Sequence, residues 1–240
     1  MIQGGIAIVA TMVKDVANEG ELLMLIGRGV YSFSDAATLT RLKSSRVREW
    51  FTSRPSTNLG SIFRSDFTDQ TSQPLISFLD LVDVFIAGQL RDYGISLQTL
   101  RRVYKTLQQD LGVEHPFGRR ELLTDGKRVF VAGLDSKGRD EVIEVLSRQK
   151  AFPLVILPFL KKLDFDKTSR LATKWNIAKG VVVNPGICFG QPIVEAKGIP
   201  TNLIAKAVFA NGNDLHSVAD WYGMTVDQVS SAIHFEKRAA

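Results

Sequence analysis

Residues Tyr31–Phe51 have the sequence YSFSDAATLTRLKSSRVREWF, and this stretch decides the fold that we expect for the front of the chain. Ser32 and Asp35 have the spacing of a capping box, in which each side chain satisfies a backbone N–H at the start of a helix. A short helix is therefore expected after Ser32, and Leu42 is placed to fill the turn at its end. Ser44 is expected to cap a second short helix.

The second helix is expected to have one buried face and one cationic face. Val47, Trp50 and Phe51 recur at the spacing of one helix face. This leaves Ser45, Arg46, Arg48 and Glu49 pointing outward. In a helix-turn-helix, outward side chains of the second helix enter the major groove, where arginine binds guanine edges and lysine or serine binds phosphates. The stretch therefore predicts a helix-turn-helix that reads DNA. Its candidate DNA-binding residues are Arg41, Lys43, Ser44, Ser45, Arg46, Arg48, Arg54 and Arg64.

Charge favours this interpretation over that of an ordinary solvated pair of surface helices. The segment from Arg41 to Arg64 contains six basic residues and one acidic residue, Glu49, a net charge of +5. The whole chain also carries +5, so the remaining residues sum to about zero. One feature opposes the motif, because the turn position often taken by glycine is Arg41, for which a positive φ angle is unfavourable.

Length and composition predict an ordinary folded protein. The chain has 240 residues, 45% of them hydrophobic, which suffices for one large domain or two smaller ones. No apolar run approaches the roughly 20 residues that span a bilayer, so no membrane segment is expected. The start of the chain lacks the basic region of a secretion signal, and the single Cys188 cannot form an internal disulfide. A cytoplasmic location is the expectation.

The regions around the helix pair extend the expected DNA-binding unit. Residues 1–30 are expected to pack on this unit or on a second subunit. Two β-prone runs, Ser61–Phe67 and Pro74–Leu81, flank a polar loop and predict a hairpin. Beside a helix-turn-helix such a hairpin is called a wing, and it lies along the phosphate backbone. Further helices are expected over residues 79–94 and after the cap residue Ser96.

This order of elements resembles the DNA-binding domain of MerR-type regulators over Arg28–Gly112. The resemblance rests on the helix pair, the expected wing and the segment FLDLVDVFIAGQLRDYGISLQTLRRVYKTL, whose GIS turn separates two helices. It implies a winged helix-turn-helix domain. The chain departs from that family further on, where neither a long dimerising helix nor a cysteine-rich effector site follows. Asp125 and Gly126 predict a hairpin turn instead.

The end of the chain predicts a second helix-turn-helix, with the opposite charge. A first apolar helical stripe consists of Leu203, Ile204, Ala207 and Val208. The apolar positions of the following two helices, which Gly223 separates, are Ala219, Val226, Val229 and Ile233. Asn211–His234 contains three acidic residues and no lysine or arginine, a net charge of −3. Since duplex binding relies largely on neutralising phosphate charge, this pair is expected to bind protein or to dimerise.

Val181–Phe235 also resembles a small bacterial family known by a domain-of-unknown-function label. The matching positions are Pro185, Ile187, Gly190, Pro192, Ile193, Ile199, Pro200, Ala205, Gly212, Val218, Tyr222, Thr225, Val229, Ala232 and Ile233. Ala196-Lys197-Gly198 replaces the family's glycine-threonine-arginine, so no role of that arginine is transferred. Proteins of this family look like antitoxins of VapBC-type modules, which are encoded beside PIN-like ribonucleases. Together with a MerR-like front half, the resemblance implies a large VapB-type antitoxin.

We therefore expect a mainly α fold with β-hairpins, in which a MerR-like winged helix-turn-helix domain precedes a small three-helix domain of helix-turn-helix type. The expected divisions are an N-terminal packing segment, a DNA-binding domain, a connecting region and a protein-interaction domain, at residues 1–30, 31–135, 136–165 and 166–240. The expected function is that of a dimeric, DNA-binding antitoxin, which neutralises a PIN-like ribonuclease and represses its own operon. The alternative is a free-standing regulator whose rear half dimerises or senses a ligand.

The resemblance implies that a ribonuclease partner holds magnesium in an acidic pocket, which basic residues near the rear domain would cover. These candidate toxin-binding residues are Lys161, Lys162, Arg170, Lys174 and Lys179. We expect no enzymatic activity, cofactor or metal, because no glycine-rich phosphate loop and no metal-ligand spacing occur. Asp164 and Asp166 are interpreted as a solvated turn. The three histidines, interpreted as turn or helix-surface residues, are His115, His216 and His234.

Overall fold

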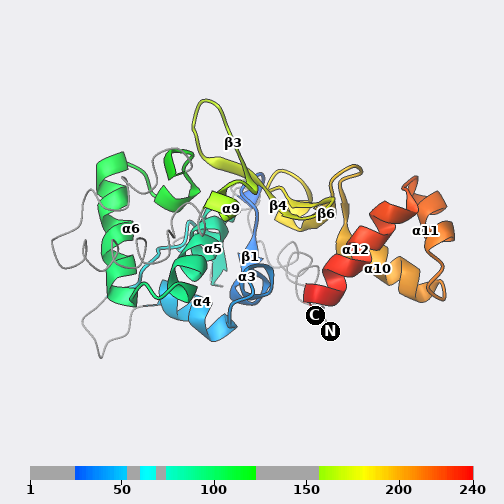
Figure 1. The fold of residues 1–240 in the computed structure, drawn as a ribbon, viewed down its shortest axis with the longest axis horizontal. Coiled ribbons are helices and arrows are strands. Elements are labelled where there is room, and N and C mark those ends of the chain that lie inside the picture. Colours follow the sequence, from blue (N-terminus) through cyan, green and yellow to red (C-terminus); the bar gives the residue numbers. More distant parts are fainter. Residues whose placement is uncertain (1–24, 53–59, 69–73, 123–156, 240) are drawn as a thin grey trace, which may run out of the picture.

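The computed structural model describes residues 25–52, 60–68, 74–122 and 157–239, and the expectations for residues 1–24, Arg54 and the Asp125-Gly126 turn lie outside this part. The described chain is a mixed α/β structure, with a helical unit at one end, three helices at the other and a sheet between them (Figure 1). Its elements in chain order are β1 (Tyr31–Ser32), α3 (Phe33–Thr40), α4 (Ser44–Phe51), β2 (Leu75–Ile76), α5 (Phe78–Asp92), α6 (Leu97–Leu111), η2 (Pro116–Gly118), α9 (Leu157–Leu160), β3 (Leu163–Phe165), β4 (Ala172–Ala178), β5 (Val181–Val183), η4 (Cys188–Gly190), β6 (Pro192–Val194), β7 (Ile199–Pro200), α10 (Thr201–Ala210), α11 (Leu215–Tyr222) and α12 (Val226–Ala239).

The capping box expected at the start of α3 is formed. The Ser32 hydroxyl accepts the Asp35 N–H at 3.1 Å, and the Asp35 carboxylate accepts the Ser32 N–H at 2.9 Å. The helix ends at Arg41, whose φ angle of 60° lies in the left-handed region that usually favours glycine. Leu42 fills the turn as predicted, because its side chain packs closely over Gly88 of α5.

The second helix, α4, has the predicted buried face and a different cap. Val47 and Trp50 are 0% and 1% exposed, and Phe51 stacks on the aromatic ring of Phe33 at 5.4 Å. The predicted cap is wrong, because the residue in the cap position is Lys43, and its side chain makes no capping bond. Ser44 is already the first helical residue, where its short side chain is exposed.

The expected wing is not formed by the described residues. The run Ser61–Phe67 contains no strand, and β2 pairs antiparallel with β1 instead. The second half of the second run, Phe78–Leu81, belongs to the start of α5. The physical reason is a second capping box, in which Ser77 Oγ accepts the Asp80 N–H at 3.1 Å and Asp80 accepts the Ser77 N–H at 2.9 Å.

Helix α5 is the centre of the front core. It is buried along nearly its whole length and contacts α3, α6 and η2. Helix α6 begins at the predicted cap, where Ser96 Oγ accepts the Thr99 N–H at 3.1 Å, and it ends at Gly112 in the left-handed conformation. Helix α6 contacts α5, and the buried residues of the two helices belong to the same core.

A five-stranded antiparallel sheet in the order β3-β4-β5-β6-β7 follows. The expectation of hairpins alone is therefore corrected, since consecutive strands pair into one continuous sheet. Trp175 in β4 packs on Phe85 of α5 with ring centres 4.4 Å apart, whereas Val194 in β6 belongs to the core of α10, α11 and α12. The sheet thus joins both cores and continues across the expected division at residues 165 and 166.

The three rear helices have the predicted arrangement. Gly223 ends α11 with a φ angle of 60°, and Val218 and Val229 are fully buried between the helices. Leu203 does not belong to the buried stripe, because it is 41% exposed. Helix α12 also continues past the acidic region, so that its last turn carries the basic side chain of Arg238.

A packed contact joins the front of the chain to the rear. The Tyr31 hydroxyl donates to the Gly190 carbonyl at 2.9 Å, and the Val30 N–H donates to the Phe189 carbonyl at 3.0 Å. Burial, together with the nearby Asp35 carboxylate, raises the pKa of the Tyr31 hydroxyl well above its usual range. Gly190 has a φ angle of 82°, and its position leaves no room for a side chain beside Tyr31.

Candidate functional site

The outward face of α4 carries most of the predicted DNA-binding residues. Its exposed residues are Lys43, Ser44, Ser45, Arg46 and Arg48. The Arg46 guanidinium lies 3.7 Å from the Asp92 carboxylate, but these side chains are 43% and 58% exposed, so water screens the pair. The Arg48 guanidinium lies 5.8 Å from the centre of the Phe33 ring. Both guanidinium groups are accessible to an anionic partner.

The remaining predicted DNA-binding residues lie elsewhere. Arg64 is exposed, and the N–H groups of Ile62–Phe63 hold its segment against the end of α4 by donating to the Trp50 carbonyl at 2.9 and 3.0 Å. Arg41, at the turn between the helices, lines a cleft on another side of α3. Arg54 lies outside the described residues.

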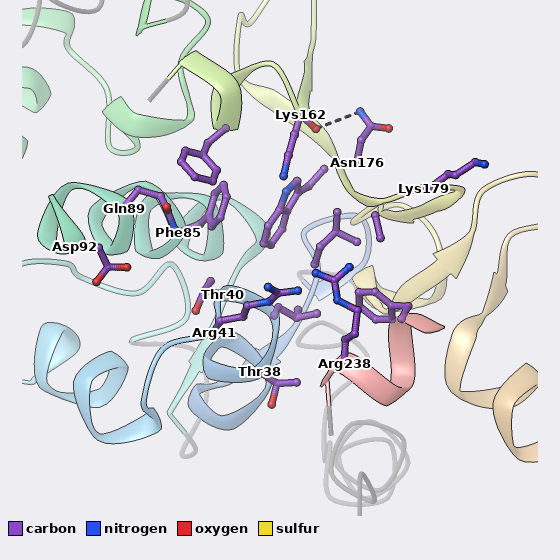
Figure 2. Close-up of a pocket in the computed structure, with 16 residues that line it drawn as sticks. Thr38, Thr40, Arg41, Phe85, Gln89, Asp92, Lys162, Asn176, Lys179 and Arg238 are labelled. Atoms are coloured by element: carbon purple, nitrogen blue, oxygen red, sulfur yellow. Dashed lines mark hydrogen bonds between the residues drawn. The ribbon is translucent and has the colours of Figure 1, made fainter. Parts of the chain in front are cut away.

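This cleft, of about 660 Å³, is bounded by α3 and α5 on one side and by α9, β4 and the end of α12 on the other (Figure 2). Its basic lining residues are Arg41, Lys162, Lys179 and Arg238. Figure 2 shows the side chains of Arg41 and Arg238 reaching into the same space, with Asp92 at the edge of the view. The structure therefore combines one predicted DNA-binding residue with two predicted toxin-binding residues in a single concave surface.

Two of the predicted toxin-binding residues already have acidic partners. Lys174 Nζ lies 2.8 Å from Asp164 and 2.7 Å from Glu195, and its hydrogen bonds to these carboxylates raise the pKa of Lys174. Arg170 Nε lies 3.0 Å from Glu121. The other three candidates are exposed, and they are Lys161, Lys162 and Lys179.

The rear domain exposes large apolar side chains that the sequence did not lead us to select. Phe209 on α10 is 81% exposed, and Trp221 on α11 is 63% exposed. Buried aromatic residues of this size dominate the energetics of protein interfaces, so their exposure indicates a contact surface. Trp221 follows the buried Val218 by three residues, so helical spacing alone did not mark it as exposed.

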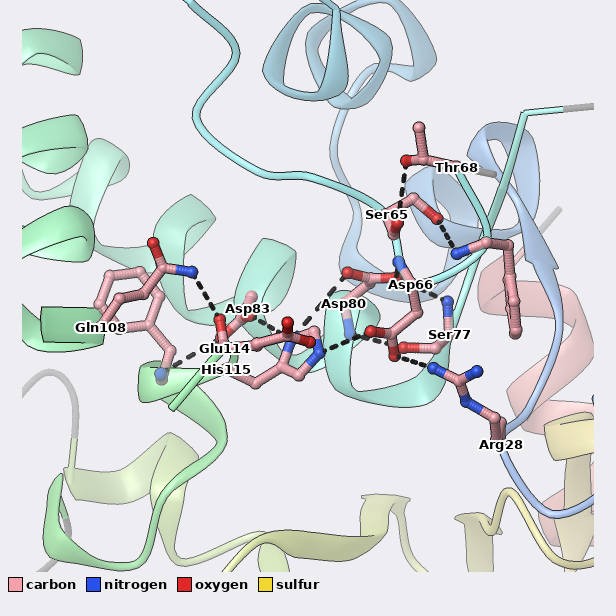
Figure 3. A network of polar contacts seen from close by, with 12 residues as sticks. Arg28, Ser65, Asp66, Thr68, Ser77, Asp80, Asp83, Gln108, Glu114 and His115 are labelled. Atoms are coloured by element: carbon pink, nitrogen blue, oxygen red, sulfur yellow. Dashed lines mark hydrogen bonds and ion pairs between the residues drawn. The ribbon is translucent and has the colours of Figure 1, made fainter. Parts of the chain in front are cut away.

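His115 lies at the centre of a buried polar network (Figure 3). Its Nδ1 is 2.8 Å from the Asp83 carboxylate, and its Nε2 is 3.0 Å from the Asp66 carboxylate. Arg28 pairs with Asp66 at 2.9 Å, and the Tyr104 hydroxyl donates to Asp83 at 2.6 Å. The network ties η2 and the segment before α3 to the buried face of α5.

The interpretation of His115 as a turn or helix-surface residue is wrong, since it is 7% exposed. The physical reason is that Asp80 and Asp83 lie on the buried side of α5, where two carboxylates require a cation. Two aspartates three residues apart in an otherwise apolar helix were the available signal. His216 and His234 are exposed, as expected.

The pKa shifts in this network follow from its geometry. Burial alone would lower the pKa of His115, but hydrogen bonds to Asp66 and Asp83 and the carboxylate charges raise it to about 11. Burial raises the pKa of Asp80 to about 7, despite the His115 charge. For Asp66 burial is the largest single effect and raises the pKa, but the hydrogen bond and charge of His115, the Ser77 hydrogen bond and the Arg28 charge together hold the pKa well below its usual range.

The same trio could be considered as a metal site, because Asp66, Asp80 and His115 place one ligand atom each within 4.8 Å of one another. Both ring nitrogens of His115 face carboxylates, so both act as N–H donors of an imidazolium. Protonation and metal binding compete for the same ring nitrogen. As arranged, the three side chains form an ion-pair cluster.

The expectation of a solvated turn holds for Asp166 but is wrong for Asp164, which lies in strand β3 opposite Lys174. Asp166 is exposed, and its carboxylate accepts the N–H groups of Thr168 and Ser169. Asp164 is paired with Lys174. Both carboxylates thus have partners within the protein.

Comparison with known proteins finds a family model that matches the rear of the chain and a solved structure of similar fold. Residues 181–235 match the family model described as "Protein of unknown function (DUF433)", which supports a small C-terminal domain of unknown function. The chain is also similar to the X-ray crystal structure of Rv2018 from Mycobacterium tuberculosis, with a TM-score of 0.69 and 21% sequence identity, over 85% of this chain and 96% of that chain. At this identity the likeness shows the fold alone. No curated protein gives a significant match.

In the described part of the chain, the helices are all too short or too polar to cross a bilayer.

Proposed function

We propose that this protein is a DNA-binding antitoxin of VapB type, which acts as a dimer, binds its operator through a MerR-like helix-turn-helix formed by α3 and α4, and inhibits a PIN-like ribonuclease through its rear half. The proposal rests on the sequence resemblance and on one observation, the contrast between its two helix pairs. The α4 face exposes arginine and lysine, whereas α11 and α12 are acidic up to His234 and stand beside exposed aromatic side chains. The first surface suits phosphates and the second suits a protein.

The DNA-binding half is tested by electrophoretic mobility shift with the DNA upstream of the gene. The double variant Arg46→Ala/Arg48→Ala should weaken binding by about tenfold or more, since each lost phosphate or base contact costs roughly 1 kcal/mol or above. A matched control is Lys167→Ala/Lys237→Ala, which removes the same charge from exposed positions away from α4. No shift by the purified protein or by its complex with the ribonuclease rejects autorepression.

The protein-binding half is tested by capture of the ribonuclease encoded in the adjacent reading frame. The double variant Phe209→Ser/Trp221→Ser should lose the complex while keeping its thermal stability, because both side chains are exposed. Tyr93→Ser is a control, since Tyr93 is 37% exposed on the front unit. Equal capture by all variants excludes this surface from the interface.

The second candidate function is a free-standing regulator that senses a ligand. The cleft beside Arg41 favours this alternative, because it lies directly at the turn between the two proposed DNA-binding helices. The adjacent reading frame discriminates between the two functions. A short protein with three or four spaced acidic residues supports the antitoxin, and any other neighbour supports the regulator.

A further inference from the structure

The cleft between the front helices and the end of α12 has a lining that points to the class of ligand it would bind. Lys162 follows α9, and Arg238 lies in the last turn of α12, so cations from distant parts of the chain converge there with Arg41. Within the described ranges, none of these three side chains makes an ion pair. The acidic lining residue Asp92 already lies near Arg46. A concave surface with uncompensated positive charge attracts an anion.

The wall of the cleft is aromatic. Phe85 packs on Trp175 with ring centres 4.4 Å apart and on Phe159 at 5.4 Å, and Phe235 of α12 completes this part of the lining. Lys162 Nζ lies 5.6 Å from the centre of the Phe159 ring. Because Phe85 and Trp175 are 6% and 2% exposed, the ring surface open to a planar group belongs to the partly exposed Phe159 and Phe235. Planar aromatic groups stack on such side chains, and neighbouring cations bind the phosphates of the same ligand.

We propose that the cleft binds a phosphorylated ligand of nucleotide size, with its phosphates on Arg41, Lys162 and Arg238 and its base against the aromatic wall. The volume of about 660 Å³ lies within the range of about 300–1,000 Å³ that is usual for small-molecule pockets. Duplex DNA does not fit the same description, since its phosphates present a convex surface. The site shares Arg41 with the predicted DNA-binding residues and Lys162 with the predicted toxin-binding residues, but nucleotide binding is measured without DNA or ribonuclease, so failure of either proposed function does not by itself remove it.

The experiment is titration calorimetry of the full chain with AMP, ADP, ATP, adenosine and inorganic pyrophosphate at physiological salt. ADP or ATP should bind more tightly than either adenosine or pyrophosphate, because the nucleotides alone use both the cations and the aromatic wall. The variant Lys162→Gln/Arg238→Gln should weaken nucleotide binding by about tenfold or more, since charge-assisted phosphate bonds are lost. The control Lys167→Gln/Lys237→Gln removes equal charge outside the cleft and should bind like the wild type.

Circular dichroism checks that each variant is folded like the wild type. Four results overturn the proposal. They are the absence of nucleotide binding, equal loss in the cleft and control variants, pyrophosphate binding as tight as that of ATP, and binding of a poly-glutamate peptide in place of nucleotides. The last result would assign the cleft to an acidic protein segment.

Discussion

The contact between Tyr31 and Gly190 predicts that Gly190→Ala is strongly destabilising. Alanine at a φ angle of 82° costs about 1–2 kcal/mol. Its Cβ would overlap the Tyr31 hydroxyl and would lie 2.8 Å from Tyr31 Cζ and 3.2 Å from Gly29 Cα. Moving the buried tyrosine breaks the bond to the Gly190 carbonyl, which adds about 1–3 kcal/mol. The sum, about 2–5 kcal/mol, is a large part of the 5–15 kcal/mol that is typical of a whole protein.

Gly212→Ala is the matched control for this prediction. Gly212 has a φ angle of 64°, but a Cβ there would meet nothing within 4 Å, so this variant carries the backbone cost without the clash. Urea unfolding followed by far-UV circular dichroism gives the free energy of unfolding of both variants. If Gly190→Ala is no more destabilising than Gly212→Ala, the packed contact between the front and rear of the chain does not exist as described.

Three further predictions concern the front unit. The pKa of His115 is raised to about 11, so the stability that protonated His115 gives the fold is complete below the unfolded pKa of about 6.5 and is lost as pH rises toward 11. Urea unfolding should therefore give a lower free energy of unfolding at pH 9 than at pH 7. Equal values at the two pH values contradict the network. Asp83→Asn should cost about 3–5 kcal/mol, whereas Asp164→Asn, in an exposed pair, should cost less than about 1 kcal/mol in the same assay. Ser32→Ala should lower the free energy of unfolding by about 1 kcal/mol and Ser44→Ala by much less, since only Ser32 is a helix cap. Equal effects of the two substitutions contradict the assignment of Ser32 as the cap.

Local signals in the sequence predicted the local structure well. The capping box at Ser32, the cap at Ser96 and the glycine stop at Gly223 each depend on residues within one turn of a helix, and each is confirmed. The wing prediction failed for a reason of the same kind. The run Pro74–Leu81 was expected to form a strand of the wing, but Ser77 and Asp80 within it form a capping box that starts helix α5.

Contacts between distant residues could not be predicted. The bond from Tyr31 to Gly190 joins residues 159 positions apart, and no pattern in either segment specifies the other. The link that the sheet makes between the two cores likewise depends on distant contacts, because Trp175 of β4 packs on Phe85 of α5, 90 positions earlier in the chain. Lys174 illustrates the same limit at the candidate site, because its charge is neutralised by Glu195, a partner 21 positions away.

The position of Arg41 changes the meaning of the charge count on which the DNA interpretation rests. In the sequence, Arg41 adds to one cationic segment with Arg46 and Arg48, but in the structure it points to the cleft while the others face solvent from α4. The positive charge is thus divided between two surfaces that share the turn after α3. An anion bound beside Arg41 would lie next to the proposed DNA-binding helix and would oppose the approach of phosphates. The front unit can therefore bind both DNA and a ligand, because α4 and the cleft present different side chains. The two surfaces are coupled through Arg41, which lies at the turn between α3 and α4.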